Sequence, residues 1–357
     1  MSASAESGTG RSSALIEVPE DIEGFSREAI RRGWSDGLPL VPPTEERVER
    51  MLGGTARDPM EIFGILSPRQ GEATVHAIAI NAVLAGCEPQ HLPILLGAVE
   101  AITDPLFNLD GINATTHPCG VFVLVHGPAA QAAGIHGGSG CFGPTFPANV
   151  SIGRAMRLIL LNIAGATPGA GDRATQGTPA KIAFCATERV DASPWPPFHT
   201  TRGLRAEESG VTAWACEGPH NIQDHGSNTG LGILQTVAGA MGQAGSNNVL
   251  ARGEPVLALG PEHAATIAND GYSREDVQRY VFENARYPGD RVSPEFLQML
   301  NERLQGGDAR GLTTDDGLPI AETAEEIHVI VAGGPGKHSS WMPTFGGMTR
   351  PVTVRLD

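Results

Sequence analysis

Hydrophobic residues follow two different periods along the chain, and these separate predicted helices from predicted strands. Helical spacing of apolar residues runs through 73–85, 89–102, 151–162, 231–241 and 261–269. Uninterrupted β-branched or aromatic runs, typical of strands buried on both faces, occupy 121–125, 255–259 and 327–331. Further strands are expected at 181–185, at 211–216 and, as an edge strand, at 352–356. This alternation predicts an α/β fold with a mixed or parallel sheet covered by helices.

Local signals place the remaining elements. Helices are expected at 21–32, 45–52, 273–285 and 294–304, and the proline-rich segment 34–44 must be extended. Thr44 is a candidate N-cap, and Gly86 ends the first helix of a predicted αα-hairpin. Residues 1–20 are expected to form a disordered tail. Residues 21–357 form one domain or two closely packed halves, about 21–245 and 246–357.

Composition narrows the class of protein. The chain has 357 residues, 46 glycines, 27 prolines and a net charge of −15, which disfavours binding to nucleic acids or anionic membranes. No apolar run approaches the roughly 20 residues that span a bilayer. The Ser-, Gly- and Ala-rich start lacks the regions of a signal peptide, so a cytoplasmic location is expected. Five cysteines without a C-x-x-C pair are expected to be free thiols.

The glycine-rich loop 134–144 follows a predicted strand and precedes a helix whose N-cap is expected at Ser151. This order is typical of a ligand-binding crossover, in which free N–H groups at the helix start bind an anion. Gly138, Ser139, Asn149 and Arg154 are the candidate substrate-binding residues. Arg154 either binds the same anion or pairs with an acid elsewhere. The spacing fits neither a dinucleotide fingerprint nor a P-loop.

Three candidate catalytic groups lie in or near such loops. Cys141 would act as a nucleophile if His136 or the helix start stabilised its thiolate; otherwise it is a small buried residue. Cys87, at the corner of the αα-hairpin, carries the same two alternatives. His117 is a candidate base or ligand, or a turn residue before proline.

Two polar loops provide further candidates. His220, Asp224 and His225 offer an acid–base pair or metal ligands, although Asx-turns alone produce similar loops. Lys337 and His338, in the second glycine-rich loop, either bind an anion or lie on a flexible surface. Asp36, beside Trp34 and Gly37, is a further binding candidate, whereas no particular metal or cofactor is predicted.

Two strand-to-glycine-loop segments resemble each other. Residues 121–144 and 327–347 each contain a strand, a Gly/Pro turn, a histidine and a Phe-Gly pair. The likeness suggests a distant internal duplication.

Four segments together resemble one bacterial family. They are Trp34–Thr44 (WSDGLPLVPPT), Ala85–Pro89 (AGCEP), Gly143–Ala155 (GPxxxANxxIGRA) and Pro261–Ala264 (PEHA). From about residue 30 onward the chain is similar to the large domain of the UGSC-type (seleno)protein family. The resemblance draws attention to Cys87, Asn149, Arg154 and His263. In that family a small domain or companion protein carries a Sec/Cys-Gly-Ser-Cys motif, which this chain lacks.

Three functions follow as hypotheses. The first is an enzyme, a lyase or hydrolase, that acts on a small anionic substrate through a thiol or histidine. The second is a redox or substrate-binding subunit that works with a small thiol or selenol partner protein. The third is a metal-dependent enzyme using His220, Asp224, His225 and His117. Low charge and abundant apolar helices also suggest a homo-oligomer.

Overall fold

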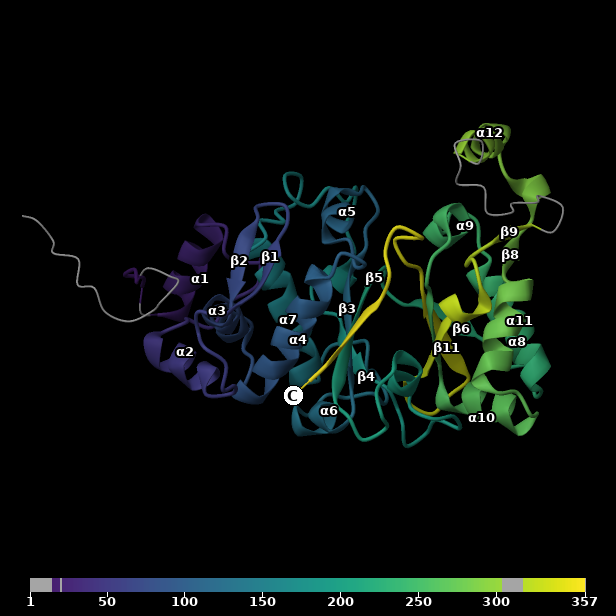
Figure 1. The fold of residues 1–357 in the computed structure, drawn as a ribbon, viewed down its shortest axis with the longest axis horizontal. Helices are drawn as coiled ribbons and strands as arrows, with labels where there is room; N and C mark the ends of the chain where they lie inside the picture. Colours follow the sequence, from purple (N-terminus) through teal and green to yellow (C-terminus); the bar gives the residue numbers. More distant parts are fainter. Residues whose placement is uncertain (1–14, 20, 304–316, 357) are drawn as a thin grey trace, which may run out of the picture.

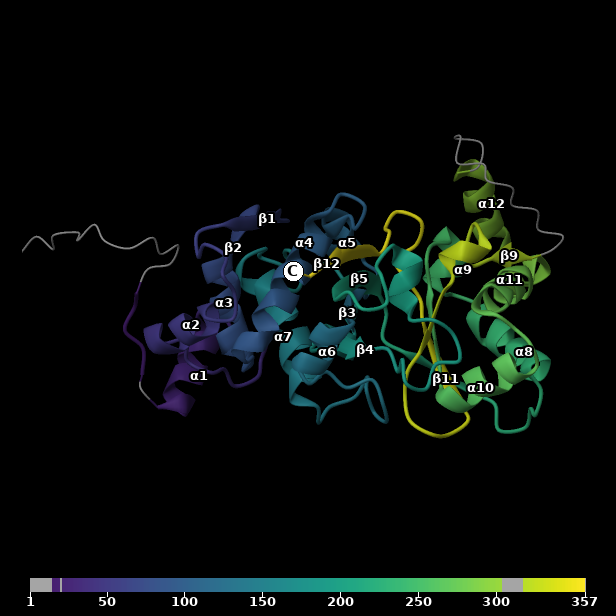
Figure 2. The same ribbon diagram turned by 60° about the horizontal axis from the view of Figure 1, so that its bottom comes forward.

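The computed structural model describes residues 15–19, 21–303 and 317–356. The predicted tail lies outside these residues except for 15–19. The chain forms four layers, in which two β-sheets pack against each other between two layers of helices (Figure 1). The view turned by 60° shows the same succession from α2 and α3 through β3 to α8 and α11 (Figure 2). The predicted α/β class is confirmed.

The first sheet contains four strands in the order β12-β5-β3-β4. Their bounds are β12 (Val352–Arg355), β5 (Gly210–Cys216), β3 (Gly120–His126) and β4 (Cys185–Thr187). Strand β3 pairs parallel with β4 and antiparallel with β5, and β12 closes the edge antiparallel to β5. The predicted edge position of the last strand is therefore confirmed.

The second sheet has the order β10-β7-β11-β6. Its strands are β10 (His328–Val331), β7 (Val256–Leu259), β11 (His338–Met342) and β6 (His220–Gln223). Strand β7 pairs parallel with β10 and antiparallel with β11, and β6 is antiparallel to β11. This is the same succession of one parallel and two antiparallel pairings as in the first sheet.

The two sheets exchange their antiparallel edge strands. Strand β5 of the first sheet leads directly into β6 of the second, and β11 of the second leads into β12 of the first. The two crossing segments lie side by side, because Cys216 forms a β-bridge with Thr344 and the Glu217 N–H donates to Pro343 O at 2.8 Å.

The strand pairing relates the two sheets differently from the sequence likeness. Pairing makes β3 equivalent to β7 and β4 equivalent to β10, whereas the sequence likeness had matched β3 with β10. The boundary at residues 245/246 does not separate the layers, because β6 precedes it and β12 follows it.

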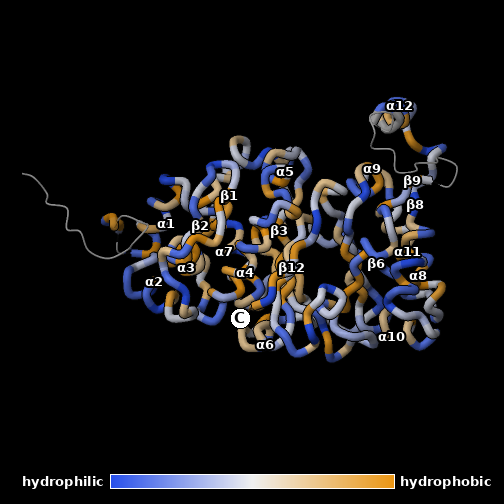
Figure 3. Tube along the Cα trace, in the orientation of Figure 1, coloured by the Kyte–Doolittle hydropathy of each residue, from blue (hydrophilic) through white to orange (hydrophobic). Residues whose placement is uncertain are grey.

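Strand periodicity builds three cores. Val123 and Val125 of β3 face the helices, whereas Phe122 and Leu124 face the other sheet. Strand β7 alternates in the same way, with Val256 and Ala258 directed between the sheets. Hydrophobic residues accordingly concentrate along β3 and α3, while α2 is largely hydrophilic (Figure 3).

Helices cover the outer face of each sheet. The first layer and its surroundings contain α1 (Ile22–Arg31), α2 (Glu45–Leu52), α3 (Val75–Ala85), α4 (Leu92–Thr103), α5 (Leu109–Ala114), α6 (Pro128–Ala132) and α7 (Pro147–Asn162). The second contains α8 (Gly230–Met241), α9 (Asn247–Ala251), α10 (Pro261–Asn269), α11 (Arg274–Asn284) and α12 (Pro294–Arg303). Two small antiparallel pairs, the hairpin of β1 (Ile62–Leu66) with β2 (Gly71–Thr74) and the pair of β8 (Arg286–Tyr287) with the distant β9 (Leu318–Pro319), complete the fold.

Most predicted elements are confirmed, but two boundaries are wrong and two strands were missed. The helix expected at 151–162 begins at Pro147, and the strand expected at 181–185 begins only at Cys185. The segments 218–226 and 332–340, both taken as loops, contribute β6 and β11. Among the described helices, none has the length and apolar composition needed to cross a lipid bilayer.

Candidate functional site

A pocket of about 270 Å³ lies where the two glycine-rich loops meet. It opens beyond the carboxyl ends of the parallel strands β7 and β10, the usual place for a ligand site in an open α/β sheet. Its lining residues come from both sheet layers: Gly140–Gly143, Ala258, Gly260, Ala332–Gly336 and His338–Ser340. The two loops singled out from sequence therefore form one site.

Glycine is required where these loops cross. The Gly333 N–H donates to Gly137 O at 2.8 Å. A Cβ at Gly334 would lie 1.8 Å from Ser139 Oγ, and a Cβ at Gly137 would lie 2.4 Å from Thr187 O. Because nothing larger than hydrogen fits, the loop packing fixes the pocket wall.

Cys141 is the thiol of this pocket. Burial raises its pKa to about 11, although the backbone N–H groups of Cys141, Gly333 and Phe142 and the positive charge of Arg189 act in the opposite direction. The thiol is thus protonated at neutral pH. A base strong enough to remove its proton would leave a thiolate near these donors.

Asn149 shapes the loop that carries Cys141. Its Oδ1 accepts from the His136 N–H at 2.8 Å, and its Nδ2 donates to the carbonyls of His136 and Cys141 at 2.8 and 3.2 Å. Helix α7 begins at Pro147, because proline is favourable at the first position of a helix, and Asn149 therefore lies in the first turn. Ser151 is inside the helix, so its expected role as N-cap is wrong.

Arg154 and Asp36 bind each other. The guanidinium forms two hydrogen bonds to the Asp36 carboxylate, at 2.7 and 2.9 Å, and a third to Pro39 O at 2.9 Å. Both side chains are nearly buried, with exposed fractions of 11% and 6%. The contacts correspond to the ion-pair alternative for Arg154. The pair joins the segment after α1 to α7.

Ser339 and His263 form a hydrogen-bonded pair in the pocket wall. His263 Nδ1 lies 2.8 Å from Ser339 Oγ, and its Nε2 lies 3.2 Å from Asp224 O. Because a carbonyl only accepts, Nε2 carries the hydrogen and Nδ1 accepts from the Ser339 hydroxyl. Burial lowers the pKa of His263, which favours this neutral form.

Arg189 lies beside both glycine-rich loops, a position that the sequence did not reveal. It follows β4, and its N–H donates to Val331 O at the end of β10. Its Nη1 donates to Gly333 O at 3.2 Å and would lie 3.2 Å from a Cβ at Gly138. A single arginine after a short strand carries no sequence signal that distinguishes it from a surface charge.

His136 and Ser139 are occupied within their own loop. His136 Nε2 lies 3.1 Å from Ser139 O, and its ring stacks on Phe146 at 3.7 Å between centroids. These contacts give His136 a role in loop packing.

His225, Lys337 and His338 gather at the pocket rim. The rings of His225 and His338 lie 5.0 Å apart, and His338 also lines the pocket. Lys337 Nζ donates to Ser227 O at 3.1 Å. The structure thus brings these three candidates together beside Cys141's pocket.

The side chains of the other polar candidates are engaged in local contacts. Asp224 accepts from Gly226 N, Ser227 N and Thr236 Oγ1, so its carboxylate closes a turn. His117 and His220 each bond to Glu217, at 2.8 and 3.1 Å, near the bridge between β5 and the segment after β11. Burial would raise the pKa of Glu217, but its hydrogen bonds with His117 and His220 lower it to about 2.

The proposed metal ligands do not converge. Within residues 15–19, 21–303 and 317–356, no three His, Cys, Asp or Glu side chains are arranged to hold a metal ion. The third hypothesis therefore gains no ligand set from the described residues.

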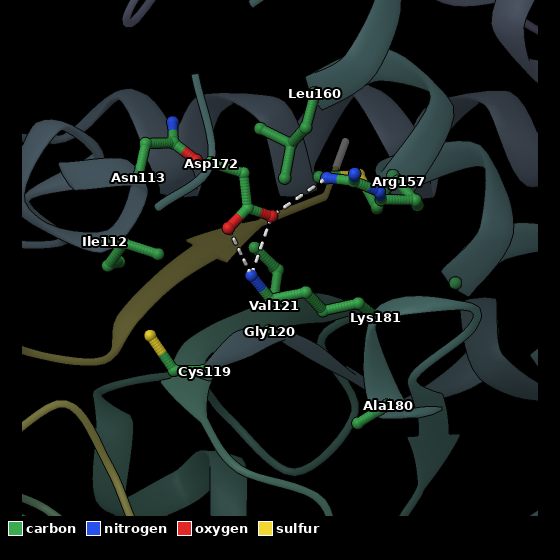
Figure 4. Close-up of a pocket in the computed structure, with 12 residues that line it drawn as sticks. Ile112, Asn113, Cys119, Gly120, Val121, Arg157, Leu160, Asp172, Ala180 and Lys181 are labelled. Carbon is green, nitrogen blue, oxygen red and sulfur yellow. Dashed lines mark hydrogen bonds and ion pairs between the residues drawn. The ribbon is translucent and has the colours of Figure 1, made fainter. Parts of the chain in front are cut away.

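A second, smaller space lies between α7 and β3 and holds about 30 Å³, room for about one water molecule (Figure 4). Lys181 Nζ contacts both carboxylate oxygens of Asp172 at 2.8 and 2.7 Å, and Arg157 approaches the same group at 3.5 Å. Burial raises the pKa of the adjacent Cys119 to about 12. The ion pairs that line this space connect α7 to the segment before β4.

Cys87 lies outside the pocket. It follows the left-handed Gly86 that ends α3, and burial raises the pKa of its thiol beyond the usual range. Its surroundings belong to the apolar core of the first layer, which corresponds to the structural alternative.

No protein-family model matches this chain, and no curated protein shows significant sequence similarity to it.

Proposed function

We propose that the chain is an enzyme, a hydrolase or lyase, that acts on a small anionic molecule in the pocket between the glycine-rich loops. One observation carries the proposal: Cys141 lines the pocket, and the nearby backbone N–H groups of Cys141, Gly333 and Phe142 counteract the rise in the pKa of its thiol. The pocket volume suits a small molecule.

The chemistry follows from the state of the thiol. With its pKa near 11, Cys141 donates a proton to a substrate, or attacks one after losing its proton to a base. The Phe142 N–H near the sulfur favours its anion in either role, whereas the N–H groups of Cys141 and Gly333 also donate to Gly138 O and Gly137 O. Backbone donors from the loops also favour a carboxylate or acyl oxygen over a cation.

Turnover of a panel of small carboxylates, esters and amides tests the proposal. We expect Cys141→Ser to reduce kcat/KM for any substrate found by about a thousandfold, because nucleophilic or acid–base groups usually contribute at this scale. Cys87→Ala is the matched control, since it removes another buried thiol outside the pocket and should leave kcat within about twofold.

Reaction with limiting iodoacetamide supplies a second measurement that needs no substrate. Mass spectrometry should find Cys141 alkylated ahead of the four other buried cysteines. Turnover retained in Cys141→Ser would refute the proposal. An inactive protein without a reactive Cys141 would favour a subunit that works with a small thiol or selenol partner protein.

A further inference from the structure

Arg189 is the cation that approaches both glycine-rich loops of the pocket. Its guanidinium contacts Gly333 O of one loop and lies where a side chain at Gly138 of the other would be. It is also close enough to Cys141 for its charge to favour the thiolate. Its main chain is anchored at the end of β10, because the Arg189 N–H donates to Val331 O.

Asp191 occupies the bidentate face of this guanidinium. The Arg189 Nε and Nη2 atoms donate to the two carboxylate oxygens of Asp191 at 2.7 and 2.9 Å. The exposed fractions differ, 29% for Arg189 and 72% for Asp191. The pair therefore joins a half-buried cation at the pocket to a carboxylate that is mostly in water.

We infer that Arg189 binds the carboxylate of the substrate and that Asp191 occupies its place in the free protein. The inference rests on the proposed function, since it assigns a substrate class to the same pocket. An entering carboxylate must displace the Asp191 carboxylate from Arg189. Because exposed ion pairs are weak, this competition reduces the affinity of the substrate by no more than about fivefold. A planar guanidinium recognises a carboxylate through the same two parallel hydrogen bonds that Asp191 accepts.

The other cations assigned to this region serve different contacts. Arg154 is bound to Asp36 by nearly buried hydrogen bonds. Lys337 Nζ donates to Ser227 O and approaches His225 O and Asn228 Oδ1. Arg189 is the one of the three whose ionic partner is largely exposed, so its partner is the easiest to exchange.

A pair of thiol reagents tests the inference on the full-length protein. Iodoacetate carries a carboxylate and iodoacetamide is neutral, while both alkylate a thiolate by displacing iodide. The ratio of their rate constants at Cys141, divided by the same ratio for a free cysteine peptide, measures carboxylate recruitment. We expect a normalised ratio above about five in the wild-type protein at low salt and a decrease at high salt.

Opposite substitutions should move this ratio in opposite directions. Arg189→Gln should reduce it at least about fivefold, and Arg189→Lys should give an intermediate value because it keeps the charge without the fork. Asp191→Asn should raise the ratio, a change that loss of folding does not produce. Arg31→Gln, which removes an equal charge from α1 at the far end of the molecule (Figure 1), is the control and should have no effect.

The outcomes separate the two proposals. Failure of both reagents to modify Cys141 contradicts the proposed thiol site itself. If both react but Arg189→Gln and Asp191→Asn leave the ratio unchanged, the thiol site stands and the role of Arg189 is wrong.

Discussion

The side-chain amide of Asn149 is bonded to the backbone of His136 in both directions, with Oδ1 accepting and Nδ2 donating at 2.8 Å. A carboxamide in this position bonds to His136 of the glycine-rich loop as a neighbouring β-strand would. It thereby connects α7 to the segment that presents Cys141.

Replacing Asn149 should therefore loosen the loop. Asn149→Ala leaves buried backbone groups without partners, and we expect a loss of about 2–4 kcal/mol in the free energy of unfolding. Asn149→Asp keeps the acceptor but loses both donated bonds, so it should be at least as unstable at neutral pH. Urea denaturation measures both, and hydrogen exchange at residues 136–141 should increase in Asn149→Ala. Unchanged exchange there would show that the loop is held by other contacts.

The Ser339–His263 pair gives a second prediction. His263→Asn retains a group that can accept from Ser339 but takes up no proton near neutral pH, whereas His263→Gln retains a donor toward Asp224 O. If His263 only supports the pocket wall, both variants should alter stability alone. If it exchanges protons with a substrate through Ser339, the acid limb of the pH–kcat/KM profile should disappear in both.

Ser340→Ala is the matched control for this experiment, because Ser340 lies on the same strand and lines the same pocket. It should keep the wild-type pH profile. An identical profile in all variants would assign the pair a purely structural role.

The Asp36–Arg154 pair should be strongly coupled. Removing one partner of a buried pair leaves an uncompensated charge, so Asp36→Ala or Arg154→Leu should each cost about 3–5 kcal/mol. The double variant should cost less than the sum of the two, with a coupling of about 2 kcal/mol or more. Chemical denaturation of the four proteins measures the cycle, and additivity would mean that the ion pair contributes nothing beyond its separate parts.

His126 should make the protein sensitive to acid. Burial, together with the nearby His199 and Arg202, lowers the pKa of His126 to about 3. The unfolded chain takes up a proton near pH 6.5 and the native protein only near pH 3, so stability decreases as pH falls between these values. For this residue the total loss is at most about 5 kcal/mol.

His126→Phe should reduce that acid dependence. The variant loses the contact with Thr212 Oγ1 at 2.7 Å, so it should be less stable at pH 7.5. Between pH 6 and 4 the free energy of unfolding of the variant should nevertheless decrease less steeply than that of the wild type. The difference in slope should be about that produced by the uptake of one proton. Urea denaturation across this range measures the slope, and equal slopes would show that other buried groups govern the acid response.

Sequence patterns correctly predicted the helices and strands whose structure depends on their own residues rather than on distant parts of the chain. The runs around Val123, Leu257 and Val329 are apolar on both faces because each strand separates two cores. Thr44 marked the start of α2 correctly, since an N-cap acts within four residues. In contrast, β6 and β11 contain polar residues that pair with distant strands, and their short sequences resemble loops.

The candidate site shows the same division. Its glycines and Cys141 were recognisable along the chain, because tight loops need particular residues. The meeting of the loops around 137 and 333, and the position of Arg189 between them, depends on packing of two sheets and has no local signature. Pro147 was the overlooked signal for the start of α7.

The exchange of β6 and β12 has a consequence for how the chain folds. Each sheet receives its last antiparallel strand from the opposite half of the sequence, so neither half contains all the strands of one sheet. A separately produced half would expose the side of β5 or β11 that the exchanged strand covers in the intact protein, and this new edge would favour association with a second polypeptide. The intact protein thus resembles a strand-swapped dimer within a single chain.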